Sequence, residues 1–247
     1  MTKLTFIGTA AGGFKGSARL KSCVYLDGLL LDCGAGVSGR LEELGLLESI
    51  DAIFVSHLHS DHVSGLYDAL VSMVIIGRSR PLKLFSPPGL RSLVQHYEDL
   101  GNKLHDPSNG FELDFVDSSD FKYSGNSFRV SPFQLDHVVT DWGYRLEKEG
   151  ICIFYTGDTR EPSALLNQKV DYLLHEATFD ESYRQLSRLH GHSTALEAAK
   201  AAETTGARRL FLVHVENRTS PPEAKLREAE SAFSNVVLPE DLESFDL

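Results

Sequence analysis

The chain has 247 residues, of which 42% are hydrophobic and 24% are charged, and its formal net charge is −11. This is the composition of a globular protein, and the length allows one large domain, which we expect to cover residues 1–247. An acidic chain repels nucleic acid in general, which makes strong non-specific binding unexpected but leaves room for a local basic patch.

The first residues, "MTKLTFIGTAAGG", are typical of a strand and a turn rather than a signal peptide. No apolar run reaches the roughly 20 residues of a membrane span. We therefore expect a cytoplasmic protein without a membrane partner. Cys23, Cys33 and Cys152 form no CxxC pair, so we expect small buried thiols rather than disulfides or a thiolate metal site.

Segments rich in β-branched and aromatic residues alternate with helical segments along the chain. The predicted strands are Lys3–Gly8, Ser22–Asp27, Leu29–Gly34, Asp51–His57, Leu82–Ser86, Ser127–Leu135, Gly143–Lys148, Ile151–Asp158, Val170–Ala177 and Arg208–Val215. The predicted helices are Val37–Leu47, Pro88–Leu100, Thr194–Thr205 and a last one that starts near Pro221. Such an alternation predicts the α/β class, with two sheets packed face to face and helices outside.

The helix predicted at Thr194–Thr205 has clear start and stop signals. Thr194 is followed three residues later by Glu197, which is a capping-box pattern, and Gly206 stands where a C′ glycine belongs. The last helix has prolines in its first turn. The polar stretch Asn102–Tyr123 has no such signals, and its role is left open.

The segment "SHLHSDH" places three histidines and an aspartate directly after an apolar strand. His57 and His59 alternate, so their side chains point the same way in an extended segment. Asp61 and His62 follow where the chain turns into a helix. The arrangement splits into two ligand pairs and predicts two metal ions on one short loop.

Two ions need further ligands, which we expect at the ends of other strands. His137, Asp158 and His214 each follow an apolar strand, where a polar group needs a reason. Asp158 is the natural bridge, because a carboxylate has two oxygens to share. Imidazole and carboxylate ligands suit divalent zinc first, with manganese or iron as alternatives. His96, His105 and His190 lack this context.

Several longer stretches resemble one family. The chain opens with "KLTFIGTAAG" and later has "DHVVTDWGYRLE", "LLHEATF" and "HGHSTALEAAKAA". With Asp32 after an early strand and HxHxDH next, they resemble ribonuclease Z and its phosphodiesterase relatives in the metallo-β-lactamase superfamily. This resemblance implies a four-layer αββα sandwich, a dinuclear metal site on one edge, and a homodimer.

The resemblance also implies a role for each site residue. It assigns His57, His59 and His137 to one ion, Asp61, His62 and His214 to the other, and Asp158 to both. Glu176 and His192 would form a pair that donates a proton to the leaving oxygen. Asp61 would also accept a proton from the attacking water.

The chain departs from that family in two places. Between His137 and Asp158 it has only a short strand pair, where ribonuclease Z proteins usually insert an RNA-gripping arm. Its first loop, "AAGGFKGSARLKS", lacks the family's proline- and arginine-containing stretch. The substrate therefore stays open between an RNA 3′ end and a small or cyclic phosphodiester, with Lys15, Arg19 and Lys21 as candidate phosphate contacts.

Two other functions compete with the phosphodiesterase. One is hydrolysis of a lactone or another ester or thioester, which the same fold also supports. The other is a non-catalytic subunit that binds metal or nucleic acid. Metal content distinguishes the non-catalytic subunit from the enzymes, because a decayed site would not hold two ions per chain.

Overall fold

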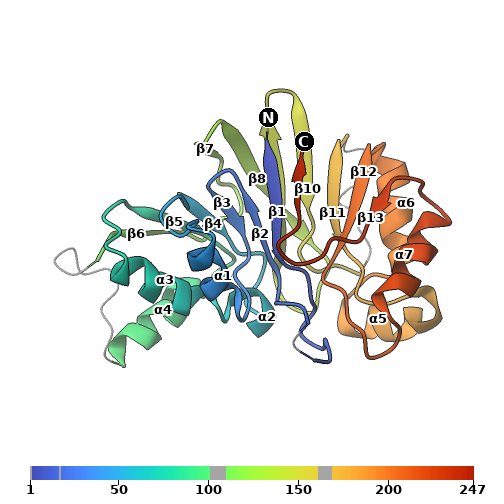
Figure 1. Cartoon of the computed structure of the whole chain (residues 1–247), viewed down its shortest axis with the longest axis horizontal. Helices are drawn as coiled ribbons and strands as arrows, with labels where there is room; N and C mark the ends of the chain where they lie inside the picture. Colours follow the sequence, from blue (N-terminus) through green and yellow to red (C-terminus); the bar gives the residue numbers. More distant parts are fainter. Residues whose placement is uncertain (1, 17, 101–109, 161–168) are drawn as a thin grey trace. The chain divides into compact units, whose positions relative to one another are not determined.

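A computed structural model describes residues 2–16, 18–100, 110–160 and 169–247 (Figure 1). Predictions that fall on residues 101–109, including His105 and the start of the polar stretch, lie outside these ranges. The chain divides into two compact units. Unit 1 comprises Met1–Gly8, Leu20–Ser118 and Asp241–Leu247, and unit 2 comprises Thr9–Arg19 and Ser119–Glu240. The expectation that residues 1–247 act as one domain stays a prediction.

Unit 1 is built on a mixed sheet of seven strands in the order β14-β1-β2-β3-β4-β5-β6. Its strands are β1 (Lys3–Gly8), β2 (Cys23–Leu26), β3 (Leu29–Leu31), β4 (Ala52–Phe54), β5 (Leu82–Phe85), β6 (Leu113–Val116) and β14 (Ser244–Asp246). The pairs from β14 to β3 are antiparallel and those from β3 to β6 are parallel. Its helices are α1 (Val37–Glu43), α2 (Ser60–Val63), α3 (Leu66–Ile75) and α4 (Leu90–Asp99).

Unit 2 has a second mixed sheet in the order β13-β12-β11-β10-β9-β8-β7. Its strands are β7 (Tyr123–Gly125), β8 (Phe128–Leu135), β9 (Asp141–Lys148), β10 (Ile151–Tyr155), β11 (Tyr172–Glu176), β12 (Arg209–Val213) and β13 (Val236–Val237). The pairs from β7 to β10 are antiparallel, whereas those from β10 to β13 are parallel. Its helices are a 3-10 turn at Glu181–Tyr183, α5 (Arg184–His190), α6 (Ala195–Thr205) and α7 (Pro222–Glu230).

The end signals of α6 act as the sequence predicts. The Thr194 side chain accepts from the Glu197 backbone N–H, the Glu197 carboxylate accepts from the Thr194 N–H, and Gly206 ends the helix in the left-handed conformation. Five buried alanines of α6 join β11 and β12 in the core of unit 2. Their small side chains allow the helix to lie close to the sheet.

Each unit has its own apolar core. The core of unit 1 joins the strands to α1, α3 and α4, and Cys23 and Cys33 belong to it. All three cysteines are buried and none forms a disulfide, as the sequence predicts. Among the residues described, none of the helices has the length and apolar composition needed to span a lipid bilayer.

The parallel strands position the candidate ligands. In unit 1, β3 ends just before Asp32 and β4 ends two residues before Ser56. In unit 2, β10 leads to Asp158, β11 ends on Glu176 and β12 leads to His214. Because neighbouring parallel strands end at one edge of a sheet, each unit gathers its polar residues at a single edge.

Candidate metal centre

The histidine loop of unit 1 is fixed by the buried carboxylate of Asp32. One Asp32 oxygen accepts from the Ser56 N–H (2.6 Å), and the other accepts from the Ser56 hydroxyl (2.8 Å) and from His62 Nδ1 (2.7 Å). His62 is fully buried beside it. The bond to a carboxylate keeps the proton on Nδ1, so Nε2 is the nitrogen that His62 offers to a metal.

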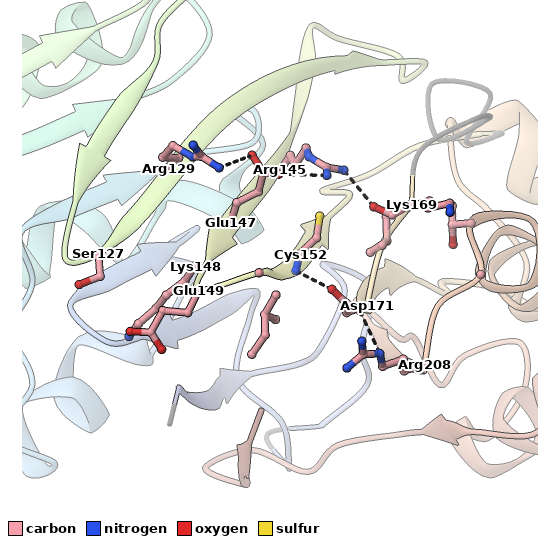
Figure 2. Close-up of a pocket in the computed structure, with 15 residues that line it drawn as sticks. Ser127, Arg129, Arg145, Glu147, Lys148, Glu149, Cys152, Lys169, Asp171 and Arg208 are labelled. Carbon is pink, nitrogen blue, oxygen red and sulfur yellow. Dashed lines mark hydrogen bonds and ion pairs between the residues drawn. The ribbon is translucent and has the colours of Figure 1, made fainter.

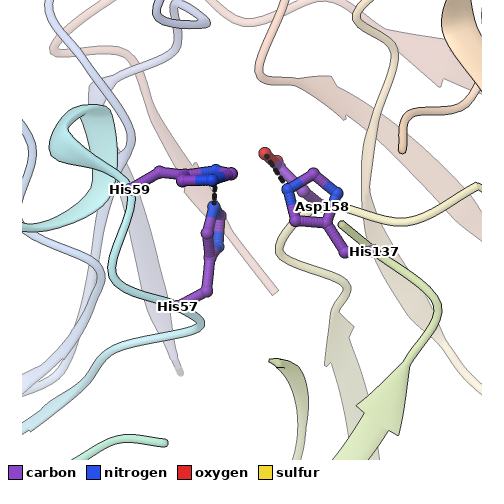
Figure 3. Close-up of side chains that lie close together, drawn as sticks. All are labelled: His57, His59, His137 and Asp158. Carbon is purple, nitrogen blue, oxygen red and sulfur yellow. Dashed lines mark hydrogen bonds and ion pairs between the residues drawn. The ribbon is translucent and has the colours of Figure 1, made fainter. Parts of the chain in front are cut away.

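His57 and His59 face each other, as their alternation predicts. His57 Nε2 lies 2.9 Å from His59 Nδ1, a contact that Figure 3 draws. His57 Nδ1 contacts the Ser56 hydroxyl at 3.0 Å. Since that hydroxyl donates to Asp32, it accepts from His57, which leaves the lone pair of His57 on Nε2. His57 Nε2 and His59 Nδ1 lie close enough together that both could bind the same metal ion.

Asp61 and His62 form the second pair of this loop. They lie in the single turn of α2, and Asp61 Oδ2 is 3.9 Å from His62 Nε2. Two glycines allow this turn to approach the segment after β3. A Cβ on Gly34 would lie 2.2 Å from the Asp61 carbonyl oxygen, and one on Gly65 would lie 2.0 Å from the Gly34 carbonyl oxygen. Any larger residue would push Asp61 and His62 away from Asp32.

His137 in unit 2 is oriented by a backbone carbonyl. Its Nδ1 donates to the Gly191 oxygen at 2.6 Å, which leaves Nε2 as the ligand nitrogen. That Nε2 lies 3.9 Å from Asp158 Oδ2 (Figure 3). Gly191 ends α5 with φ 83°, and a Cβ there would lie 2.6 Å from His137 Nδ1. Only glycine combines this backbone conformation with such a close approach.

His214 and Asp158 lie together at the same edge. His214 Nδ1 is 3.3 Å from Asp158 Oδ1 and 2.9 Å from the Thr178 hydroxyl. The backbone of His214 has φ 52°, a left-handed conformation that costs free energy for a residue with a side chain. It is held because Val215 pairs with the segment Thr9–Ala11, accepting from the Ala11 N–H (2.9 Å) and donating to Thr9 (3.1 Å).

The buried carboxylate of Glu176 organises the rest of this edge. One oxygen accepts from the Thr159 N–H (2.8 Å) and lies 3.1 Å from His192 Nδ1. The other accepts from the Thr178 hydroxyl at 2.6 Å. His192 Nδ1 also lies 3.7 Å from Asp158 Oδ2. The pair that the resemblance implies, Glu176 with His192, is therefore formed in the structure.

Two pKa shifts accord with this arrangement. Burial lowers the pKa of His137, only partly offset by the charge of Asp158, which favours the neutral ring that binds metal. Burial alone would raise the pKa of Glu176, but the charge and hydrogen bond of His192 outweigh it and hold that pKa below its usual value. Glu176 is thus an ionised carboxylate able to hold a charged imidazole.

The donor set of each half fits divalent metal ions. The ligand candidates are imidazole nitrogens and carboxylate oxygens, and His62 and His137 have their second nitrogen committed to an oxygen, as metal-bound histidines usually do. Within unit 2, Asp158, His192 and His214 place ligand atoms within 4.8 Å of one another. The same grouping would allow His192 to be a metal ligand instead of a general acid. An experiment must distinguish these two roles.

Two hydroxyl groups that connect carboxylates to histidines are not predicted by the sequence. Ser56 joins Asp32 to His57, and Thr178 joins Glu176 to His214. Both belong to motifs singled out above, "SHLHSDH" and "LLHEATF". Serine and threonine at strand ends are so common that sequence alone gave no reason to assign them a role.

The three candidate phosphate contacts have different surroundings. Arg19 is buried, and its guanidinium donates to the Thr9 hydroxyl (2.7 Å), the Pro239 carbonyl (2.7 Å) and Glu240 (2.7 Å). These bonds tie the first loop to the end of unit 2 and commit Arg19 to structure. Lys15 is exposed in unit 2, and Lys21 is half-buried in unit 1. Of the three residues predicted as phosphate contacts, Lys15 and Lys21 therefore remain candidates for binding a substrate.

Comparison with known proteins assigns the chain to a family. A model of the beta-lactamase superfamily domain matches residues 28–215. Ribonuclease Z of Metallosphaera sedula is 30% identical over an alignment that covers 100% of this chain and 99% of the relative. Human tRNase Z, short form, matches with a TM-score of 0.79 and 26% identity over 99% of this chain and 98% of that one. The metallo-beta-lactamase fold protein YhfI from Bacillus subtilis gives a TM-score of 0.82 at 22% identity, covering 99% and 98%.

The chain therefore belongs to the metallo-β-lactamase superfamily, in its ribonuclease Z-like branch. The predicted α/β fold class, the αββα sandwich of that superfamily, is confirmed by the fold likenesses. The family and the similarity to proteins named ribonuclease Z make this protein a metal-dependent hydrolase that acts on phosphodiesters.

Proposed function

We propose that the chain holds two divalent metal ions and cleaves phosphodiester bonds of RNA 3′ ends or of small or cyclic phosphodiesters. His57, His59 and His137 would hold one ion, Asp61, His62 and His214 would hold the other, and Asp158 would contribute to both. The proposal is supported by the way Asp32 and Gly191 orient His62 and His137, and by the curated relatives named ribonuclease Z.

Zinc is our first choice of metal, with manganese or iron as alternatives, because the ligands are imidazoles and carboxylates without a thiolate. When bound, such ions supply Lewis acidity to phosphoryl oxygens and make water more acidic. The protein supplies the geometry. Asp32 and the Gly191 carbonyl lock ring orientations, so the ligand nitrogens are fixed before an ion arrives.

The observation that carries the proposal is the pairing of His192 with Glu176. His192 Nδ1 faces a fully buried carboxylate at 3.1 Å, while its side chain keeps 15% exposure. A charged imidazole held in this way can donate its Nε2 proton to a departing alkoxide oxygen. Phosphodiesters of RNA have such a leaving group, which needs protonation far more than the leaving groups of activated esters do.

Asp61 has the second proton-transfer role. It lies in the first turn of α2 with a side chain that is 15% exposed, next to His62 at 3.9 Å. A carboxylate in that position could accept a proton from the attacking water.

The test is a substrate panel with protein loaded with Zn²⁺ or Mn²⁺. A precursor tRNA with a 3′ trailer, bis(p-nitrophenyl) phosphate, a cyclic nucleotide and a lactone would be compared. Cleavage of the phosphodiesters, with a kcat/KM well above that for the lactone, supports the proposal. A preference for the lactone, or metal-free protein that is equally active, contradicts it.

Cleavage at the trailer would assign an RNA 3′ end as substrate and an endonuclease activity. Hydrolysis of the small diesters alone would assign the small-substrate activity. A homodimer and a cytoplasmic location stay predictions, which gel filtration with light scattering and cell fractionation would check.

A further inference from the structure

Unit 2 has a second polar site at the other edge of its sheet. A cleft of about 810 Å³ is lined by the β9–β10 turn, the residues before β11 and β12, and the end of α6. Because β10, β11 and β12 are parallel, this edge carries their amino ends, whereas Asp158, Glu176 and His214 follow their carboxyl ends. A five-residue strand separates the two edges by roughly 16 Å.

The cleft has a positive local charge, opposite in sign to the net charge of the whole chain. Its lining has five basic side chains, Arg129, Arg145, Lys148, Lys169 and Arg208, against three acidic ones, Glu147, Glu149 and Asp171. The whole chain has a net charge of −11, so a local basic excess stands out. Figure 2 shows these side chains around one opening.

The carboxylates of the cleft orient the arginines. Glu147 contacts Arg145 at 3.2 Å and Arg129 at 4.0 Å, and Arg145 also donates to the Lys169 carbonyl at 3.1 Å (Figure 2). Asp171 accepts from the Cys152 N–H at 2.8 Å and pairs with Arg208 Nε at 3.0 Å. The guanidiniums of Arg145 and Arg208 are therefore oriented by these contacts, which lowers the entropic cost of binding an anion there.

Exposure leaves these arginines accessible to a ligand. The Arg129 side chain is 76% exposed and that of Arg208 is 70% exposed. Ion pairs at such exposure contribute little to stability, so folding alone gives a weak reason for them. Guanidinium groups that keep donors in solvent suit phosphate oxygens.

The spread of the cations indicates the size of the ligand. Arg129 is on β8 and Arg208 directly precedes β12, and these strands are separated by β9, β10 and β11 in the sheet. Four strand spacings amount to roughly 19 Å. One phosphate group cannot contact both ends of such a row, whereas a chain with regularly spaced phosphates can.

We propose that this cleft binds the phosphate backbone of an RNA substrate, away from the bond that is cleaved. The inference rests on the proposed function, and it selects an RNA chain over a small diester as the substrate class. The half-buried apolar side chain of Ile151 in the lining would face sugar or base atoms. No covalent step takes place there.

The test compares the wild type with a double variant that carries both Arg129→Ala and Arg208→Ala. Both side chains are exposed, so the fold should survive. Binding of a fluorescent single-stranded RNA, measured by anisotropy near 0.1 M salt, should weaken about tenfold or more, and the slope of log K against log salt should fall by about one to two. The kcat/KM for bis(p-nitrophenyl) phosphate should stay within about twofold.

Two further variants sharpen the result. Glu149→Gln removes a negative charge from the β9–β10 turn and should tighten RNA binding, a gain that a purely structural role would not give. Arg80→Ala is the matched control, because Arg80 is an arginine of unit 1 that is 52% exposed and pairs with Asp51 at 2.8 Å. It should leave RNA binding within about twofold of the wild type.

Unchanged RNA binding in the double variant overturns the inference. So does a variant that loses affinity for adenosine monophosphate but keeps its affinity for RNA, because the cleft would then serve free nucleotides. If the wild type hydrolyses neither RNA nor bis(p-nitrophenyl) phosphate, the proposed function fails, while the binding measurement still decides the role of the cleft.

Discussion

Replacing His192 by alanine should slow the enzyme in a way that depends on the leaving group. Loss of a general acid costs roughly 10²- to 10³-fold in kcat/KM for a diester with an alkoxide leaving group, or about 2.7–4 kcal/mol. Bis(p-nitrophenyl) phosphate should slow by less than about tenfold, since nitrophenolate departs without a proton. The prediction rests on the 3.1 Å contact of His192 Nδ1 with the buried Glu176 carboxylate.

The variant should still fold. Glu176 keeps the Thr159 N–H at 2.8 Å and the Thr178 hydroxyl at 2.6 Å, so its charge is not left unsatisfied. Its pKa, now held down by His192, should rise. A carboxylate whose folded pKa is depressed stabilises the fold above its unfolded pKa and loses that contribution as pH falls through its folded pKa. The variant should therefore be less stable than the wild type at neutral pH, with the difference shrinking in acid.

The assay measures kcat/KM for both substrates, metal content and thermal unfolding. His190→Ala is the matched control, because His190 is an exposed histidine at the end of α5 and outside the Glu176 contacts. Equal slowing of the two substrates would refute the acid role. A loss of bound metal would show instead that His192 is a ligand, as its grouping with Asp158 and His214 allows.

Three other changes have expected outcomes. Asp61→Ala should leave the circular dichroism spectrum unchanged and reduce turnover by at least about 10³-fold, and wild-type rates in the folded variant would disprove its role. Gly191→Ala adds a Cβ 2.6 Å from His137 Nδ1 at φ 83°, so it should lower the free energy of unfolding by about 1–3 kcal/mol and weaken metal binding. An unchanged melting temperature would contradict this interpretation. Burial raises the pKa of Cys152 to about 11, so iodoacetamide at pH 8 should alkylate this thiol about 100-fold more slowly than an unperturbed one. The rate should rise towards pH 11, and fast alkylation at pH 8 in folded protein would argue against this burial.

The local geometry of the histidine loop could be predicted because it follows from strand geometry. Residues that alternate in an extended segment share a face, and His57 and His59 accordingly meet at 2.9 Å. The ends of α6 were equally predictable, since the Thr194 and Glu197 side chains act on neighbouring backbone groups. Signals of this kind lie within a few residues of the structure that they determine.

Other features depend on contacts that are distant in sequence. The Gly191 carbonyl that orients His137 lies 54 residues away, and Thr178 contacts His214 across 36 residues. The sequence pattern does not predict helix α3, because "LYDALVSMVI" is apolar on nearly every side and periodicity cannot separate such a run from a buried strand. The hydrogen bond from Arg19 to the Pro239 carbonyl joins residues 220 apart in the sequence, so no local signal predicts it.

The metal content of the purified protein tests most directly whether the chain holds two divalent ions. Inductively coupled plasma mass spectrometry should find about two ions per chain in the wild type, and fewer in Asp158→Ala, which removes the shared carboxylate. A wild-type protein that binds less than one ion per chain after loading with Zn²⁺ or Mn²⁺, while fully folded, would contradict the account.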